Sequence, residues 1–171
     1  LDELKRIVSV HGKDLAAIVI EPIRNKKPDS GFIEGIRALS DESGAVFIVD
    51  EISAAFRYLT GGAHLKLFSH MPDLAVFSKA LGNGYPIAAI IGKLEVMESA
   101  QKTFISSTNW TDRIGPTAAL ATIKKHREIN VAEHLISIGD KVQQGWRNLA
   151  QRHGLNIKVG GMKPASHFVF L

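Results

Sequence analysis

AVFIVDE, residues 45–51, places five apolar residues directly before two adjacent carboxylates. Short apolar runs rich in β-branched residues are typical of buried strands, so we expect a strand that ends at Asp50 and Glu51. A carboxylate pair at a strand end can serve two different chemistries. It can hold a magnesium ion beside a nucleotide, or one carboxylate can face the ring nitrogen of a bound cofactor. The neighbouring segments have to decide between these two interpretations.

The segments on either side predict an α/β fold with a mostly parallel sheet. AAIVIEP (16–22) has the composition of a second buried strand, and residues 31–43 have the pattern of a helix that Asp29 or Ser30 caps and Gly44 ends. Strand, helix and strand in this order form a βαβ unit, and continuous apolar runs favour a parallel sheet that is covered on both faces. Two further strands are expected at 74–78 and 87–92, after a long irregular connection over 52–73.

The second half of the chain predicts helices and a separate small sheet. Helical patterns cover 116–127 and 131–153, and the runs NIKVGG and HFVFL are typical of strands. In the longer helix the expected buried face consists of Val131, Leu135, Ile138, Val142, Trp146 and Leu149. We therefore expect residues 1–128 to belong to a large domain and residues 129–171 to begin a small α+β domain. Both ends resemble the interior of a longer protein, so we expect a fragment.

Composition excludes several classes of function. The 171 residues include no cysteine, which removes disulfides, thiolate metal sites and a cysteine nucleophile. The net charge of +4 is spread along the chain and aromatic residues make up only 7%, whereas a nucleic-acid binder usually shows a basic stripe with aromatics. No apolar run is long enough to cross a bilayer, and the spacing of the histidines does not resemble a metal site. We expect a cytoplasmic protein with no metal, nucleic acid or membrane partner.

The nucleotide interpretation of Asp50 and Glu51 lacks its usual companion. A P-loop ATPase needs a GxxxxGK[ST] loop whose N–H groups hold the phosphates, and no such stretch occurs in these residues. This weakens a magnesium–nucleotide site without eliminating it.

Lys79 favours the cofactor interpretation. It follows the expected strand at 74–78 and precedes a glycine turn, in FSKALGNGYP (77–86). Because the carboxyl ends of parallel strands lie at one edge of a sheet, Asp50 and Lys79 should lie near each other, where such folds bind ligands. Apolar strand ends around a lysine would desolvate it and favour the free amine that forms a Schiff base.

The chain resembles the class III pyridoxal-phosphate-dependent aminotransferases. The similarity rests on DEISAAFR (50–57), LTGGA (59–63), PDL (72–74) and SKALGNGYPIAA (78–89), in order and with their spacing intact. The nearest branch is similar to the glutamate-1-semialdehyde aminomutases. This resemblance implies the aspartate aminotransferase-like fold (fold type I), pyridoxal 5'-phosphate (PLP) as cofactor, and an aminotransferase or aminomutase acting on a small amino substrate.

The resemblance also implies roles for two residues that carry the chemistry. Lys79 would form the Schiff base with the cofactor and afterwards move a proton. Asp50 would pair with the pyridinium nitrogen, and at about 4 Å and an effective dielectric near 20 that pairing favours the protonated ring by roughly 4 kcal/mol. A protonated ring is the electron sink that makes the neighbouring C–H acidic.

Four further positions receive supporting roles from the same resemblance. Ile52 would pack on a face of the ring, Glu51 would support the site through hydrogen bonds, and Glu21 would lie near the substrate. Thr111 would bind the cofactor phosphate of a neighbouring subunit, which implies a homodimer with a shared active site.

The sequence also departs from the family. Relatives often carry glutamine where Ser53 stands, and the upstream phosphate loop and ring-stacking aromatic are not among these residues. The alternative to an active enzyme is therefore a folded but catalytically inactive fragment.

Overall fold

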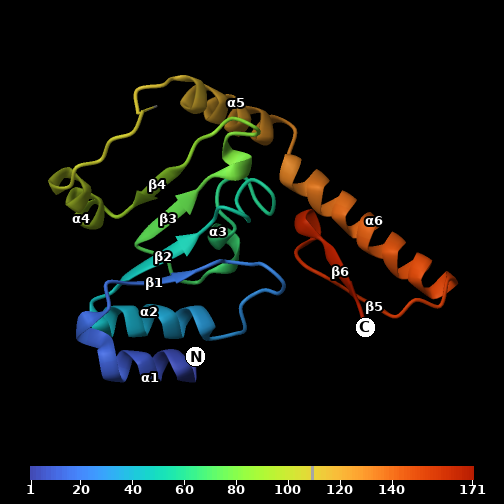
Figure 1. Ribbon diagram of the computed structural model, residues 1–171, viewed down its shortest axis with the longest axis horizontal. Coiled ribbons are helices and arrows are strands. Elements are labelled where there is room, and N and C mark those ends of the chain that lie inside the picture. Colours follow the sequence, from blue (N-terminus) through green and yellow to red (C-terminus); the bar gives the residue numbers. More distant parts are fainter. Residues whose placement is uncertain (109) are drawn as a thin grey trace.

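A four-stranded sheet forms the centre of the chain (Figure 1). The computed structural model describes residues 1–108 and 110–171. The strands are β1 (Ala17–Ile20), β2 (Val46–Asp50), β3 (Leu74–Phe77) and β4 (Ala89–Gly92), and they lie in this order across the sheet. β1 and β3 each pair parallel to β2, whereas β4 pairs antiparallel to β3. The predicted α/β fold with a mostly parallel sheet is confirmed.

Two helices near the N-terminus lie side by side, and the second of them lies next to the sheet (Figure 1). They are α1 (Asp2–His11), which the 3-10 helix η1 (Gly12–Asp14) follows, and α2 (Phe32–Ser43). The predicted side-chain cap of α2 is wrong, because Gly31 precedes the helix in a left-handed conformation with φ 75°. Gly44 ends the helix at φ 73°, as the sequence indicates.

Only one face of the sheet is well covered. Phe47 and Val49 are fully buried on the face that packs against α2. The opposite face carries Val19 and Ile90, which are 58% and 54% exposed. The expectation of cover on both faces is therefore wrong for the described residues, since no described helix buries this second face.

The connections after β2 and β4 contain short helices. The predicted irregular segment between β2 and β3 holds α3 (His64–Leu67), and the 3-10 helix η2 (Lys79–Leu81) follows β3. After β4 come α4 (Leu94–Met97) and the 3-10 helix η3 (Glu98–Lys102).

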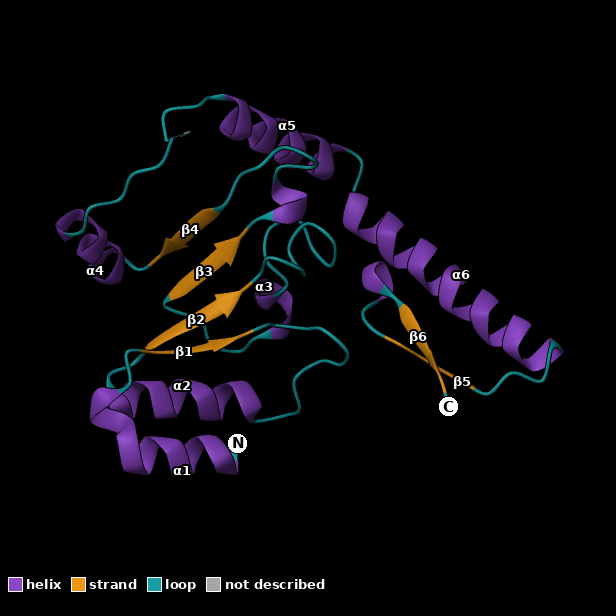
Figure 2. Ribbon diagram, viewed as in Figure 1, coloured by secondary structure: helices purple, strands orange, loops and turns teal. Residues whose placement is uncertain are grey.

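The C-terminal part consists of two long helices and a hairpin (Figure 2). α5 (Ile114–Glu128) leads to α6 (Val131–Arg152), which lies against the antiparallel pair β5 (Ile157–Gly160) and β6 (His167–Phe170) and the 3-10 helix η4 (Lys163–Ala165). No helix of the described residues is both long and apolar enough to cross a membrane.

The buried face of α6 differs from the predicted one. Gly139 and Gln143 are buried, and a Cβ atom on Gly139 would lie 1.9 Å from the Lys163 carbonyl oxygen. Gln143 Nε2 donates to the Ser166 hydroxyl at 3.0 Å. Gly139 lets η4 approach closely, and Ile138 and Val142 of the predicted apolar stripe remain 41% and 38% exposed.

Candidate active site

Three of the predicted site residues, Glu21, Asp50 and Lys79, lie at or just after the carboxyl ends of neighbouring strands. Asp50 is the last residue of β2, and it pairs in register with Val76 of β3, three positions before Lys79. Glu21 directly follows β1, whose last residue pairs with Val49. The structure thus brings the ends of three neighbouring strands together, and the expected proximity of Asp50 and Lys79 follows from strand register.

Asp50 lies on the poorly covered face of the sheet. Side chains alternate along β2, so Asp50 shares a face with Ile48 and, through its register, with Val76. Its side chain is half-buried, and Oδ1 accepts a hydrogen bond from the Ile52 N–H at 2.9 Å. Within the described residues Oδ2 has no such donor, so one carboxylate oxygen is available on an apolar surface.

Lys79 begins η2 with an unusual backbone. Its φ is 45°, in the left-handed region that costs a non-glycine residue roughly 1–2 kcal/mol. The side chain is exposed, and Nζ donates to Ser53 Oγ at 2.9 Å. The prediction that apolar strand ends desolvate Lys79 is therefore wrong, because the turn carries the amine out over the sheet edge.

Glu51 points to the opposite side from Asp50 and is completely buried. Oε1 accepts hydrogen bonds from the backbone N–H of His64 and from its Nδ1, both at 2.7 Å, whereas Oε2 is buried without a partner among the described residues. A Cβ atom on Gly62 would lie 2.9 Å from Oε1, so glycine is needed there. Glu51 thus ties the start of α3 to the end of β2.

The remaining predicted residues lie in connections between the elements. Ile52 is half-buried in the turn after Asp50. Glu21 is half-buried, its Oε1 lies 3.3 Å from Arg24 Nη1, and its Oε2 is buried without a partner in the described part of the chain. Thr111 is exposed in the connection before α5.

Sequence reasoning missed a buried histidine that fixes the loop after Asp50. His126 of α5 is 4% exposed, and its Nε2 donates to the Phe56 carbonyl at 2.7 Å while Nδ1 contacts Thr60 Oγ1 at 2.6 Å. Phe56 has a φ of 58° and its ring packs edge-on against His126. The only signal was an unpaired polar residue on an otherwise apolar helix face, which does not identify a partner 70 residues away.

Sequence comparison identifies the family of the chain. The family described as Aminotransferase class-III matches residues 1–162, nearly the whole chain. The chain belongs to the class III aminotransferases. Family membership agrees with the strand-end aspartate and lysine, and it leaves the magnesium–nucleotide interpretation of Asp50 without support.

Curated relatives of this class III chain include enzymes of two kinds. A 3-aminobutyryl-CoA aminotransferase of Cloacimonas acidaminovorans is 35% identical over 168 residues, and a glutamate-1-semialdehyde 2,1-aminomutase of Clostridium botulinum is 32% identical over 171 residues. Each alignment covers 94% of this chain but only 40% of the relative. The class III chain thus spans about 40% of the length of these relatives.

Solved structures confirm the fold of the class III chain. The FumI protein of Sphingopyxis sp. MTA144, determined in its PLP internal aldimine form, superposes with a TM-score of 0.92 at 29% identity and covers 99% of this chain and 42% of its own. A transaminase with PLP bound superposes at 0.85 with 22% identity over 96% of this chain and 41% of its own, which supports the fold alone.

Proposed function

We propose that this chain carries the lysine and the ring-nitrogen carboxylate of a PLP-dependent enzyme that transfers an amino group. The observation that supports this most directly is the position of Asp50 and Lys79 at the adjoining ends of two parallel strands, β2 and β3. Relatives named as aminotransferase and aminomutase point in the same direction.

The residues present fit the cofactor. When bound, PLP supplies an aldehyde that reacts with a primary amine and a ring that withdraws electrons from the neighbouring C–H bond. Asp50 is half-buried, and its Oδ2 has no hydrogen-bond donor among the described residues, so this carboxylate oxygen can accept a hydrogen bond from a protonated ring nitrogen. Lys79 offers an exposed primary amine just after the neighbouring strand β3, where Nζ donates to Ser53 Oγ.

Lys79 and Asp50 would then divide the chemistry. Lys79 would hold the cofactor through its amine, and its Nζ would carry a proton at the substrate carbon. Ser53 Oγ, 2.9 Å from Nζ, orients that amine. Asp50 would accept a hydrogen bond from the protonated ring nitrogen and so stabilise its positive charge.

The supporting roles complete the proposal. Ile52 would pack on the ring, Glu21 would lie near the substrate, and Thr111 would bind the phosphate in the site of a second subunit of a homodimer. Residues 1–128 would belong to the PLP-binding large domain and 129–171 would begin the small domain. We also propose a cytoplasmic location, which the cysteine-free composition supports.

Borohydride trapping tests the proposal. The chain is incubated with PLP, its visible absorbance is recorded, and the adduct is reduced and located by mass spectrometry of peptides. We expect one labelled residue, Lys79, and loss of the label in Lys79→Ala but not in Lys66→Ala, a control at an exposed lysine of α3. Label spread over many lysines in a folded sample would favour the inactive-fragment alternative. An aminotransferase moves the amino group between two molecules, whereas an aminomutase moves it within one molecule, so following the amino group separates the two activities.

A further inference from the structure

A cavity lined by positively charged side chains lies beside Lys79. The roles proposed above for Lys79 and Asp50 do not account for it. Its volume is about 480 Å³. It lies between the loop after β2, the 3-10 helix η2, the last turns of α5 and the first turns of α6. Arg57, Lys79 and Lys125 line it, together with the buried His126. Among the described residues that line it there is no aspartate or glutamate.

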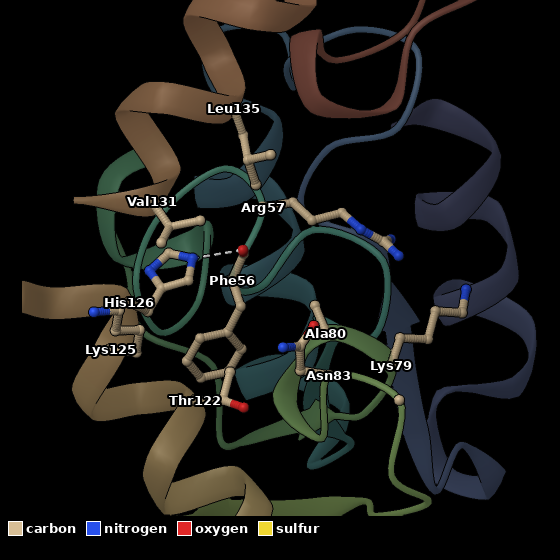
Figure 3. A pocket seen from close by; sticks show the side chains of 11 residues that line it. Phe56, Arg57, Lys79, Ala80, Asn83, Thr122, Lys125, His126, Val131 and Leu135 are labelled. Atoms are coloured by element: carbon tan, nitrogen blue, oxygen red, sulfur yellow. Dashed lines mark hydrogen bonds between the residues drawn. The ribbon is translucent and has the colours of Figure 1, made fainter. Parts of the chain in front are cut away.

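Two of these cations are held at one residue. Arg57 Nη1 donates to the Ser53 carbonyl oxygen at 2.8 Å, and Lys79 Nζ donates to Ser53 Oγ at 2.9 Å. Figure 3 shows the two side chains extending along the same side of the cavity, with Lys125 and His126 on the other. Two positive charges so placed repel each other, and an anion between them would relieve that repulsion.

The described residues do not supply this anion. Arg57 is half-buried and its only side-chain hydrogen bond among them goes to a neutral carbonyl, whereas the other half-buried arginine of the fold, Arg37, binds both Asp41 and Asp73. Lys125 lies 4.0 Å from Glu128, a contact near the surface that leaves most of its charge uncompensated.

The chemistry of the lining defines the missing partner. A guanidinium offers a planar pair of N–H donors that matches the two oxygens of a carboxylate or phosphate. Phe56, Ala80, Val131 and Leu135 give the same cavity an apolar wall suited to a short carbon chain. We propose that this cavity binds an oxyanion, carboxylate or phosphate, of the molecule that reacts at Lys79, and that Arg57 is its anchor. The link to Lys79 chemistry rests on the proposed function, but oxyanion binding itself does not.

Calorimetric titration at low salt tests the binding. The probes are glutarate and inorganic phosphate, added to the chain without PLP. We expect at least one to bind, with an affinity that falls on addition of sodium chloride and drops at least tenfold in Arg57→Ala. Arg57→Lys keeps the positive charge but loses the planar pair of N–H donors, so its affinity should lie between those of the unchanged chain and Arg57→Ala. Arg6→Ala, at an exposed arginine of α1, should bind like the unchanged chain.

Two substitutions at Arg57 are used because one of them could impair folding. Near-ultraviolet circular dichroism checks the fold of each variant, and we expect Arg57→Lys to retain the fold even if Arg57→Ala does not. The proposal is overturned if neither probe binds the unchanged chain, or if both folded Arg57 variants bind as tightly as the unchanged chain.

A second arm separates the two sources of the oxyanion. Trapping at Lys79 is repeated with PLP and with pyridoxal, which lacks the phosphate. If the cavity holds the cofactor phosphate, Arg57→Lys should trap less PLP than the unchanged chain but as much pyridoxal. If the cavity holds a substrate carboxylate, Arg57→Lys should trap both compounds as well as the unchanged chain does, while its affinity for glutarate falls. Absence of any trapping at Lys79 would refute the proposed function alone, because the calorimetric result stands without it.

Discussion

Replacing Asp73 with asparagine should remove a large share of the stability of the fold. Asp73 lies directly before β3, and its side chain is 8% exposed. Oδ2 accepts hydrogen bonds from the Phe47 N–H of β2 at 2.7 Å and from Arg37 of α2 at 3.0 Å, and Oδ1 lies 2.7 Å from Lys93 Nζ after β4. One carboxylate therefore joins three strands and a helix.

The magnitude follows from what each partner loses. Breaking a buried ion pair by neutralising one member costs about 3–5 kcal/mol. Lys93 is 49% exposed and adds little, whereas Arg37 is 13% exposed and would keep its charge, so we expect about 3 kcal/mol. Urea unfolding followed by far-ultraviolet circular dichroism measures this, and the melting temperature should fall by about 6–12 °C.

The stability lost in Asp73→Asn should depend on pH, because the Asp73 carboxylate titrates. Burial raises the pKa of Asp73, but hydrogen bonds from Lys93, the Phe47 N–H and Arg37 outweigh burial and hold the pKa below its ordinary 3.8. A lowered folded-state pKa means that this stabilisation is complete above pH 3.8 and is lost as the pH falls through the folded-state pKa. The difference in the free energy of unfolding between the unchanged chain and Asp73→Asn should therefore become smaller at acidic pH.

Asp41 provides the matched control, because it pairs with the same Arg37 at 2.6 Å but is 66% exposed. Asp41→Asn should cost less than about 1 kcal/mol. The reasoning is refuted if Asp73→Asn costs no more than Asp41→Asn, or if the difference between Asp73→Asn and the unchanged chain does not change between neutral and acidic pH.

Three further predictions concern packing. His126→Ala leaves the Phe56 carbonyl buried without its donor and should cost about 2–3 kcal/mol in urea unfolding, more than an exposed His134→Ala. Gly139→Ala forces a Cβ to within 1.9 Å of a backbone oxygen of η4, so a loss of more than about 1 kcal/mol is expected. Gly145→Ala meets open space on the same helix and should instead stabilise the chain by about 0.5–1 kcal/mol; equal effects at the two glycines would contradict the close approach of α6 and η4.

The strands and the site edge could be predicted because each depends on local pattern. Phe47 and Val49 lie in an unbroken apolar run, which specifies a strand buried in a parallel sheet. Once β2 and β3 are parallel neighbours, their carboxyl ends must meet, so the proximity of Asp50 and Lys79 needed no knowledge of side-chain conformation.

What escaped prediction depends on contacts between distant segments. The buried face of α6 is set by the close approach of η4 at Gly139, whereas apolar periodicity identified the longer side chains beside it. The exposure of Lys79 follows from a left-handed turn that the sequence does not mark with glycine, and the His126–Phe56 hydrogen bond spans 70 positions.

The open face of the sheet sets how much Asp50 can contribute within this chain. A carboxylate about 4 Å from a ring nitrogen is worth about 1 kcal/mol in water and about 4 kcal/mol at an effective dielectric near 20. Since Val19 and Ile90 on the same face are 58% and 54% exposed, water reaches this surface, and the lower value applies to the 171 residues alone. Under the proposed function, Asp50→Asn should then slow amino transfer from an amino acid to PLP by about fivefold, as measured by visible absorbance. A thousandfold loss in this chain would mean that the face is already dry and that its exposed valine and isoleucine do not report the surroundings of Asp50.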